Sequence, residues 1–111
     1  MTSRNFDPQL EALDQRATSR LLTAESFDLN AFTDLWEYLA QKAESIKQDY
    51  AISKQMLGSL RNAAKAIRTQ APYVPLAREN MALADKFEML LDLMIIGESP
   101  SDRVPGIPRI I

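Results

Sequence analysis

Apolar residues recur on a helical period through the middle of the chain, between residues 28 and 71. Their spacing alternates steps of four and three without a change of phase, and one position, Ser53, is polar. A repeat of 3.5 residues keeps one side of a helix facing a partner helix, as in a coiled coil. We call these positions the apolar stripe; they are Phe32, Trp36, Leu39, Ala43, Ile46, Tyr50, Ser53, Leu57, Leu60, Ala64, Ile67 and Ala71.

The apolar stripe predicts one continuous central helix. Gly58 is the one residue inside it that opposes a helix, at a cost on the order of 1 kcal/mol relative to alanine. The alternative is a bend between Asp49 and Ser53, which folds two shorter helices into a monomeric bundle. We expect the continuous helix, because a bend normally resets the phase of such a pattern.

Capping residues mark the ends of the predicted helices. Asp7 and Asp28 each precede a helical apolar pattern, and a carboxylate at this position accepts the free amide hydrogens of the first turn. Phe27 and Phe32 are spaced as a hydrophobic staple at the start of the central helix. Gly97 suits a C-terminal cap. The three predicted helices span about 8–24, 29–71 and 75–96.

The composition changes toward the C-terminus, where residues 98–111 hold three of the six prolines. An apolar residue recurs there at every third position, Val104, Ile107 and Ile110, which polyproline II would align along one edge. We therefore predict a helical domain, 1–97, followed by an extended tail. We expect the tail to cover apolar surface of its own chain or of a dimer mate; the alternative is a peptide that docks into another protein.

The predicted all-α arrangement leaves more apolar surface than one chain can cover. Short connections place the two shorter helices antiparallel along the two halves of the long one, which gives a rod about two helices thick. Such a rod exposes large apolar faces to water. We therefore predict a homodimer with two-fold symmetry, in which two chains complete a four-helix cross-section.

Basic residues gather beside the apolar stripe, and no acidic residue occurs from 50 to 78. The acidic residues of the third predicted helix complement them, so we expect ion pairs that fix the register of the helices. The alternative is that the basic residues stay open to nucleic-acid phosphates, in which case binding depends strongly on salt. We call this set the basic stripe; it consists of Lys47, Lys54, Arg61, Lys65 and Arg68.

The composition removes most catalytic chemistry. The 111 residues include no histidine and no cysteine, so the usual general base, the zinc-site patterns and the Ser-His and Cys-His nucleophile systems are absent. Carboxylates share helical faces at two places, but helical metal sites normally combine such groups with histidine. We expect no enzymatic activity, no cofactor and no metal. The carboxylates in question are Glu11 and Asp14, and Asp85, Glu88 and Asp92.

The remaining properties predict a protein of the cytoplasm that does not contact membranes. The net charge is −2, the N-terminus leads into no apolar signal segment, and the most apolar run, 87–96, is far shorter than a bilayer requires. The leading functional hypothesis is a non-enzymatic helical interaction module or small scaffold that presents a helix face and its tail to a protein partner. The alternative hypothesis is a nucleic-acid-associated regulatory protein that uses the basic stripe.

Overall fold

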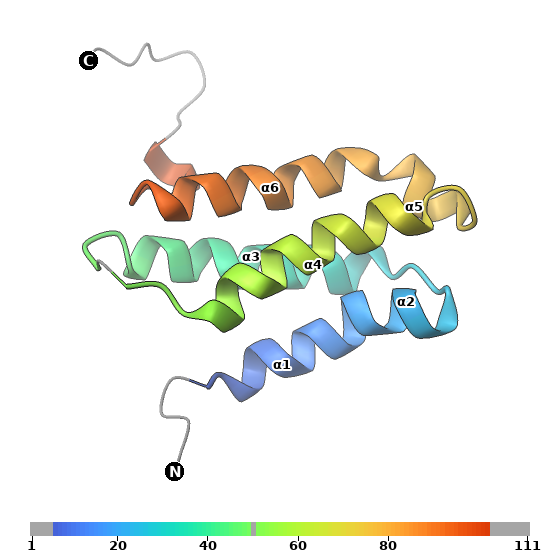
Figure 1. Cartoon of the computed structure of the whole chain (residues 1–111), viewed down its shortest axis with the longest axis horizontal. Coiled ribbons are helices and arrows are strands. Elements are labelled where there is room, and N and C mark those ends of the chain that lie inside the picture. Colours follow the sequence, from blue (N-terminus) through green and yellow to red (C-terminus); the bar gives the residue numbers. More distant parts are fainter. Residues whose placement is uncertain (1–5, 50, 103–111) are drawn as a thin grey trace.

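The computed structural model describes residues 6–49 and 51–102, and all regular structure within them is helical. Successive helical rods run in opposite directions (Figure 1). The first rod packs on α3, and α6 packs along α4. The first rod comprises α1 (Pro8–Asp14), the π-helical turn η1 (Gln15–Ser19) and α2 (Arg20–Ala24); the others are α3 (Leu29–Ser45), α4 (Lys54–Gln70), and α5 (Pro75–Glu79) with α6 (Met81–Ile95).

The central segment is two helices, so the predicted continuous helix from 29 to 71 is wrong. α3 ends at Ser45, and the chain reverses before α4 begins at Lys54 (Figure 1). Ser53 caps α4, because its hydroxyl accepts hydrogen bonds from two amides of the first turn at 3.1 and 3.4 Å. An N-cap residue has non-helical backbone angles, as Ser53 does, so α4 begins after it. The bend before Ser53, the alternative reading of the sequence, is the observed structure.

Both halves of the apolar stripe face the same core, although α3 and α4 are separate helices. A helix that turns back on itself returns its apolar side to the helix it left, so a 3.5-residue pattern does not require a continuous helix. The four-helix cross-section that we expected from two chains is therefore complete in one chain. The stripe residues buried in this core are Phe32, Leu39, Ala43, Leu60, Ala64 and Ile67.

The predicted helix caps are confirmed. The carboxylates of Asp7 and Asp28 accept hydrogen bonds from amides of the first turns of α1 and α3. The rings of Phe27 and Phe32 stack with centroids 5.0 Å apart, as a staple requires. Gly97 has a φ of 79°, and its amide and the following one donate to carbonyl oxygens in the last turn of α6. This paired arrangement ends the helix in a Schellman motif.

The first and third predicted helices have local irregularities. A π-helical turn lies inside the first rod, which otherwise spans the predicted 8–24. The third breaks at Asn80, whose φ and ψ of −118° and 30° are not helical. The side-chain amide of Asn80 donates to the carbonyl oxygen of Leu76 at 2.7 Å, and such local hydrogen bonds compete with the helical pattern.

The prediction starts the extended tail too early in the sequence, because part of the segment after residue 98 is folded. Pro100–Asp102 forms a 3₁₀ turn, η2, and Ser99 just before it is fully buried. The Ser99 amide donates to the Asp102 carboxylate at 3.0 Å, and the Asp102 amide donates to the Ser99 carbonyl oxygen at 2.9 Å. These two local hydrogen bonds favour a turn over polyproline II. The apolar tail residues Val104, Ile107 and Ile110 lie outside the described residues.

Candidate interaction surfaces

The structure separates the basic stripe into paired and open residues, beginning with Arg68. Its guanidinium forms ion pairs with Asp85 and Glu88 of the neighbouring α6. This is the pairing between basic and acidic helices that the sequence led us to expect. Since Arg68 is already matched by two carboxylates, it contributes little free positive charge to the surface.

Lys47 lies in the turn after α3, because the helix break removes it from the line of the α4 residues. Its ammonium group is 3.0 Å from Glu44 and 3.1 Å from Asp102. The hydroxyls of Ser99 and Ser101 donate to the same Glu44 carboxylate at 2.6 and 2.7 Å. These bonds lower the pKa of Glu44 to about 2, and the hydrogen bond from Ser99 has the largest effect. The cluster fastens η2 to the C-terminal end of α3.

Three residues of the basic stripe remain open. Lys54, Arg61 and Lys65 are exposed on α4, and none of them forms a hydrogen bond or ion pair with a described residue. Their spacing, together with Gly58, places them along one side of the helix. A Cβ atom at Gly58 would have no atom from the rest of the protein within 4 Å. We call this side of the helix, defined by these four residues, the α4 ridge.

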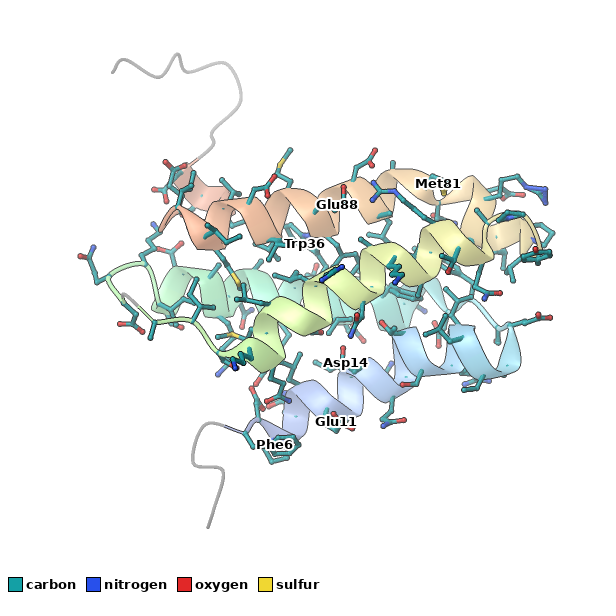
Figure 2. The ribbon with its side chains drawn as sticks, in the orientation of Figure 1. Phe6, Glu11, Asp14, Trp36, Met81 and Glu88 are labelled. Carbon is teal, nitrogen blue, oxygen red and sulfur yellow. The ribbon has the colours of Figure 1, made fainter. Side chains whose placement is uncertain are left out.

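An apolar groove lies between α3 and α6. Its floor and walls enclose about 220 Å³. Trp36 reaches from α3 toward α6 (Figure 2), where its indole N–H donates to the Lys86 carbonyl oxygen at 3.2 Å. The Lys86 ammonium lies 4.5 Å from the indole centroid, a cation–π distance. The residues that line the groove are Trp36, Lys86, Met89, Leu90, Leu93 and Pro100.

The exposed apolar side chain at this groove is Met89 of α6. Met89, which lines the groove, is 61% exposed, whereas Leu93 beside it is buried; Ile96, just after the end of α6, is 58% exposed and lines a separate hollow. The sequence led us to expect that this helix would be covered on several sides. Within the described residues it is covered by α3 and α4 and open elsewhere. We call the apolar lining residues Trp36, Met89, Leu93 and Pro100 together the Trp36 surface.

A more polar cavity of about 520 Å³ lies near the start of α1. The Tyr38 hydroxyl donates to the Asp7 carboxylate, and Gln55 exchanges two hydrogen bonds of 2.9 Å with the Asp7 backbone. Burial, and then the bond to Asp7, raise the pKa of Tyr38 to about 12. These contacts join α1, α3 and α4. The tyrosine is a weak acid held against a carboxylate, so the cluster supports the fold and offers no activated nucleophile.

One of the acidic pairs noted in the sequence is partly buried. The Ser59 hydroxyl donates to the Asp14 carboxylate at 2.5 Å and links α4 to α1. Burial raises the pKa of Asp14 above its usual range. Glu11 lies one turn away on the exposed surface (Figure 2). In residues 6–49 and 51–102, no group of three acidic side chains is placed to hold a metal ion.

The sequence placed Trp36 on the apolar stripe, which predicts a buried side chain, and the structure shows it half-buried at a groove. Exposure of this ring depends on how α3 and α6 pack, which no local pattern records. In the described part of the chain, no helix has the length and apolar character to cross a bilayer. Comparison of the chain with protein-family models, with curated proteins and with solved structures gives no match.

Proposed function

We propose that this protein is a non-enzymatic helical interaction module, and that the Trp36 surface is where it binds a second copy of itself. The observation that supports the proposal is the apolar character of this surface around a half-buried tryptophan. Contiguous exposed apolar surface marks interaction sites. Aromatic residues and methionine are enriched at the centres of protein interfaces.

Charge favours a second copy as the occupant. Lys86 and Asp92 lie three residues before and three residues after Met89 on α6. If two α6 helices pair antiparallel about a two-fold axis at Met89, Lys86 of each chain faces Asp92 of the partner subunit. A two-fold interface must be self-complementary in this way, and two-fold dimers are the commonest assemblies. The proposed dimer therefore buries apolar side chains at its centre and matches opposite charges at its sides.

Light scattering of the full chain tests the proposal. We expect a molar mass of twice 12.5 kDa for the native chain and 12.5 kDa for Met89→Glu, because the substitution places two carboxylates together at the axis. The matched control is Leu22→Glu, which changes a 49% exposed leucine on α2 at the opposite edge of the bundle (Figure 1). This control keeps the dimer. A native chain that is monomeric at all concentrations contradicts the proposal.

A charge exchange tests the geometry of pairing. Lys86→Glu or Asp92→Lys alone weakens the dimer, because each sets like charges opposite one another. The double variant restores the opposite-charge pairs and the dimer. Because Lys86 also lies over the Trp36 ring, Lys86→Gln is the control for loss of that contact. If Lys86→Gln keeps the dimer and the double variant does not restore it, α6 does not pair with itself about Met89.

The competing occupant of the groove is the C-terminal tail of the same chain. Trp36 is the one tryptophan of the chain, so its fluorescence reports directly on the groove. If the tail covers the groove in a monomer, Ile107→Glu weakens that contact and exposes the indole to water. The indole emission then shifts to longer wavelength. A dimeric chain whose emission changes with Met89→Glu and not with Ile107→Glu agrees with the proposal.

A further inference from the structure

We propose that the α4 ridge is a binding site for the sugar–phosphate backbone of a nucleic acid. The ridge carries three cationic side chains, Lys54, Arg61 and Lys65, that are exposed and form no ion pair with a described residue. The two other members of the basic stripe are occupied by carboxylates. The inference therefore concerns the open residues alone, and it is independent of dimer formation through the Trp36 surface.

Gly58 is the second observation. Glycine inside a helix is unfavourable because its backbone loses the most conformational freedom on folding. Neither packing nor backbone geometry demands it here, since a Cβ atom would meet open space and its φ is not in the left-handed region. The missing side chain instead leaves helix backbone accessible between Lys54 and Arg61. We therefore infer that Gly58 allows the backbone of another molecule to approach the helix closely.

The chemistry of the ridge favours a polyanion over a protein. The exposed residues of α4 are all polar: Lys54, Arg61, Asn62, Lys65 and Thr69. A protein partner would find little apolar surface to bury at this face, since Leu57 beside the ridge is only partly exposed, whereas the centre of a protein interface is normally apolar. A phosphate backbone requires only positive charge and hydrogen-bond donors. No acidic residue occurs in α4 to oppose it.

The length of the ridge suits several phosphates. Lys54 and Lys65 are separated by about 16 Å along the helix at about 1.5 Å per residue. Phosphates of one duplex strand follow each other every 3.4 Å or so along the axis. Since the strand also winds around that axis, the straight ridge follows one strand over only a few phosphates, about one for each of its three cations. Contacts of this kind carry no sequence information, so we expect binding that does not depend on base sequence.

Fluorescence anisotropy with the full chain and a labelled duplex of about 20 base pairs tests the inference at about 20 to 200 mM salt. Three phosphate contacts predict a slope near −2.7 for log affinity against log salt concentration. Replacing Lys54, Arg61 and Lys65 by alanine lowers the affinity about tenfold or more at low salt. The matched comparison is between Arg61 and Lys65 on the ridge and Arg20 and Arg78 elsewhere, which are also exposed and form no ion pair with a described residue; replacing Arg20 and Arg78 by alanine removes the same charge and has a much smaller effect.

Gly58→Leu separates accessibility from charge. Leucine is a better helix former than glycine, and a Cβ atom at this position has open space around it, so we expect the melting temperature to rise while duplex affinity falls. Three results overturn the inference: no binding to duplex or to single-stranded DNA at low salt, equal losses in the ridge and control variants, or binding to a polyglutamate peptide that is as tight as binding to DNA. The last result assigns the ridge to an acidic protein.

Discussion

At the scale of single residues, Glu44 is the group that holds the C-terminal end of the described chain in place. It accepts hydrogen bonds from Ser99 and Ser101 and forms an ion pair with Lys47. Each of these partners interacts with the ionised carboxylate, so together they stabilise that form. The side chain remains 55% exposed, and solvent screening keeps the effect on stability well below what a buried pair would give.

Glu44 should therefore make stability depend on acid. Its folded pKa of about 2 lies below the ordinary value of 4.5, so the stabilisation is present above pH 4.5 and is lost as the pH falls toward 2. Chemical denaturation across this range should show a steeper loss of unfolding free energy in the native chain than in Glu44→Gln. A residual slope is expected in the variant, because the pKa values of Asp7 and Asp102 are lowered as well.

Glu37→Gln is the matched control, since it changes the same residue type in the same helix at a position with no ion pair to a described residue. Its pH profile should follow that of the native chain. Identical profiles for Glu44→Gln and the native chain would contradict the role given to the cluster of Glu44, Lys47 and Ser99.

At the scale of elements, the signals that act over a few residues were predictable and those that depend on packing were not. Asp28 and Gly97 cap helices because of hydrogen bonds to neighbouring residues, which the sequence records directly. Ser53 carries an equally local signal for a helix start, but the constant phase of the apolar stripe favoured a continuous helix. A continuous helix and a helical hairpin bury the same positions, so that pattern had no power to decide between them.

Positions within the basic stripe were also predictable only where the helices that carry them were identified. Arg68 was placed correctly against acidic residues because both helices involved were identified and their charges are opposite. Lys47 was misplaced because its position depended on the continuous helix. The Trp36 surface and the open space at Gly58 were not predictable, since exposure follows from how whole helices pack.

If Ser53 determines where α4 begins, Ser53→Ala should destabilise the protein by about 1 kcal/mol, the usual cost of losing a serine cap. Its hydroxyl accepts two amide hydrogens that alanine leaves without a partner. Urea denaturation measures the change. Thr69→Ala, at an exposed position of the same helix, should change the stability by less than about 0.5 kcal/mol. Equal effects of the two substitutions would show that the cap does not stabilise the hairpin.

At the scale of the whole molecule, the hairpin of α3 and α4 changes what the chain needs from a partner. The described residues extend 45 × 42 × 19 Å, whereas a continuous helix over 29–71 would alone span about 64 Å at 1.5 Å per residue. The core is closed within one chain. Association therefore no longer has to complete a fold, and a dimer through the Trp36 surface would join two bundles that are already folded.

Small-angle scattering distinguishes these assemblies by size. In Met89→Glu, which we expect to be monomeric, the radius of gyration should lie slightly above the 14.6 Å of the described Cα atoms, because side chains, hydration and the remaining residues add to it. A value of about 20 Å or more in this monomer would indicate a rod built on the continuous helix. If the proposed dimer forms, the radius of gyration of the native chain should be larger than that of Met89→Glu. The helical circular-dichroism signal per residue should be the same for both proteins. Loss of helicity in the variant would instead mean that folding of the bundle depends on the second copy.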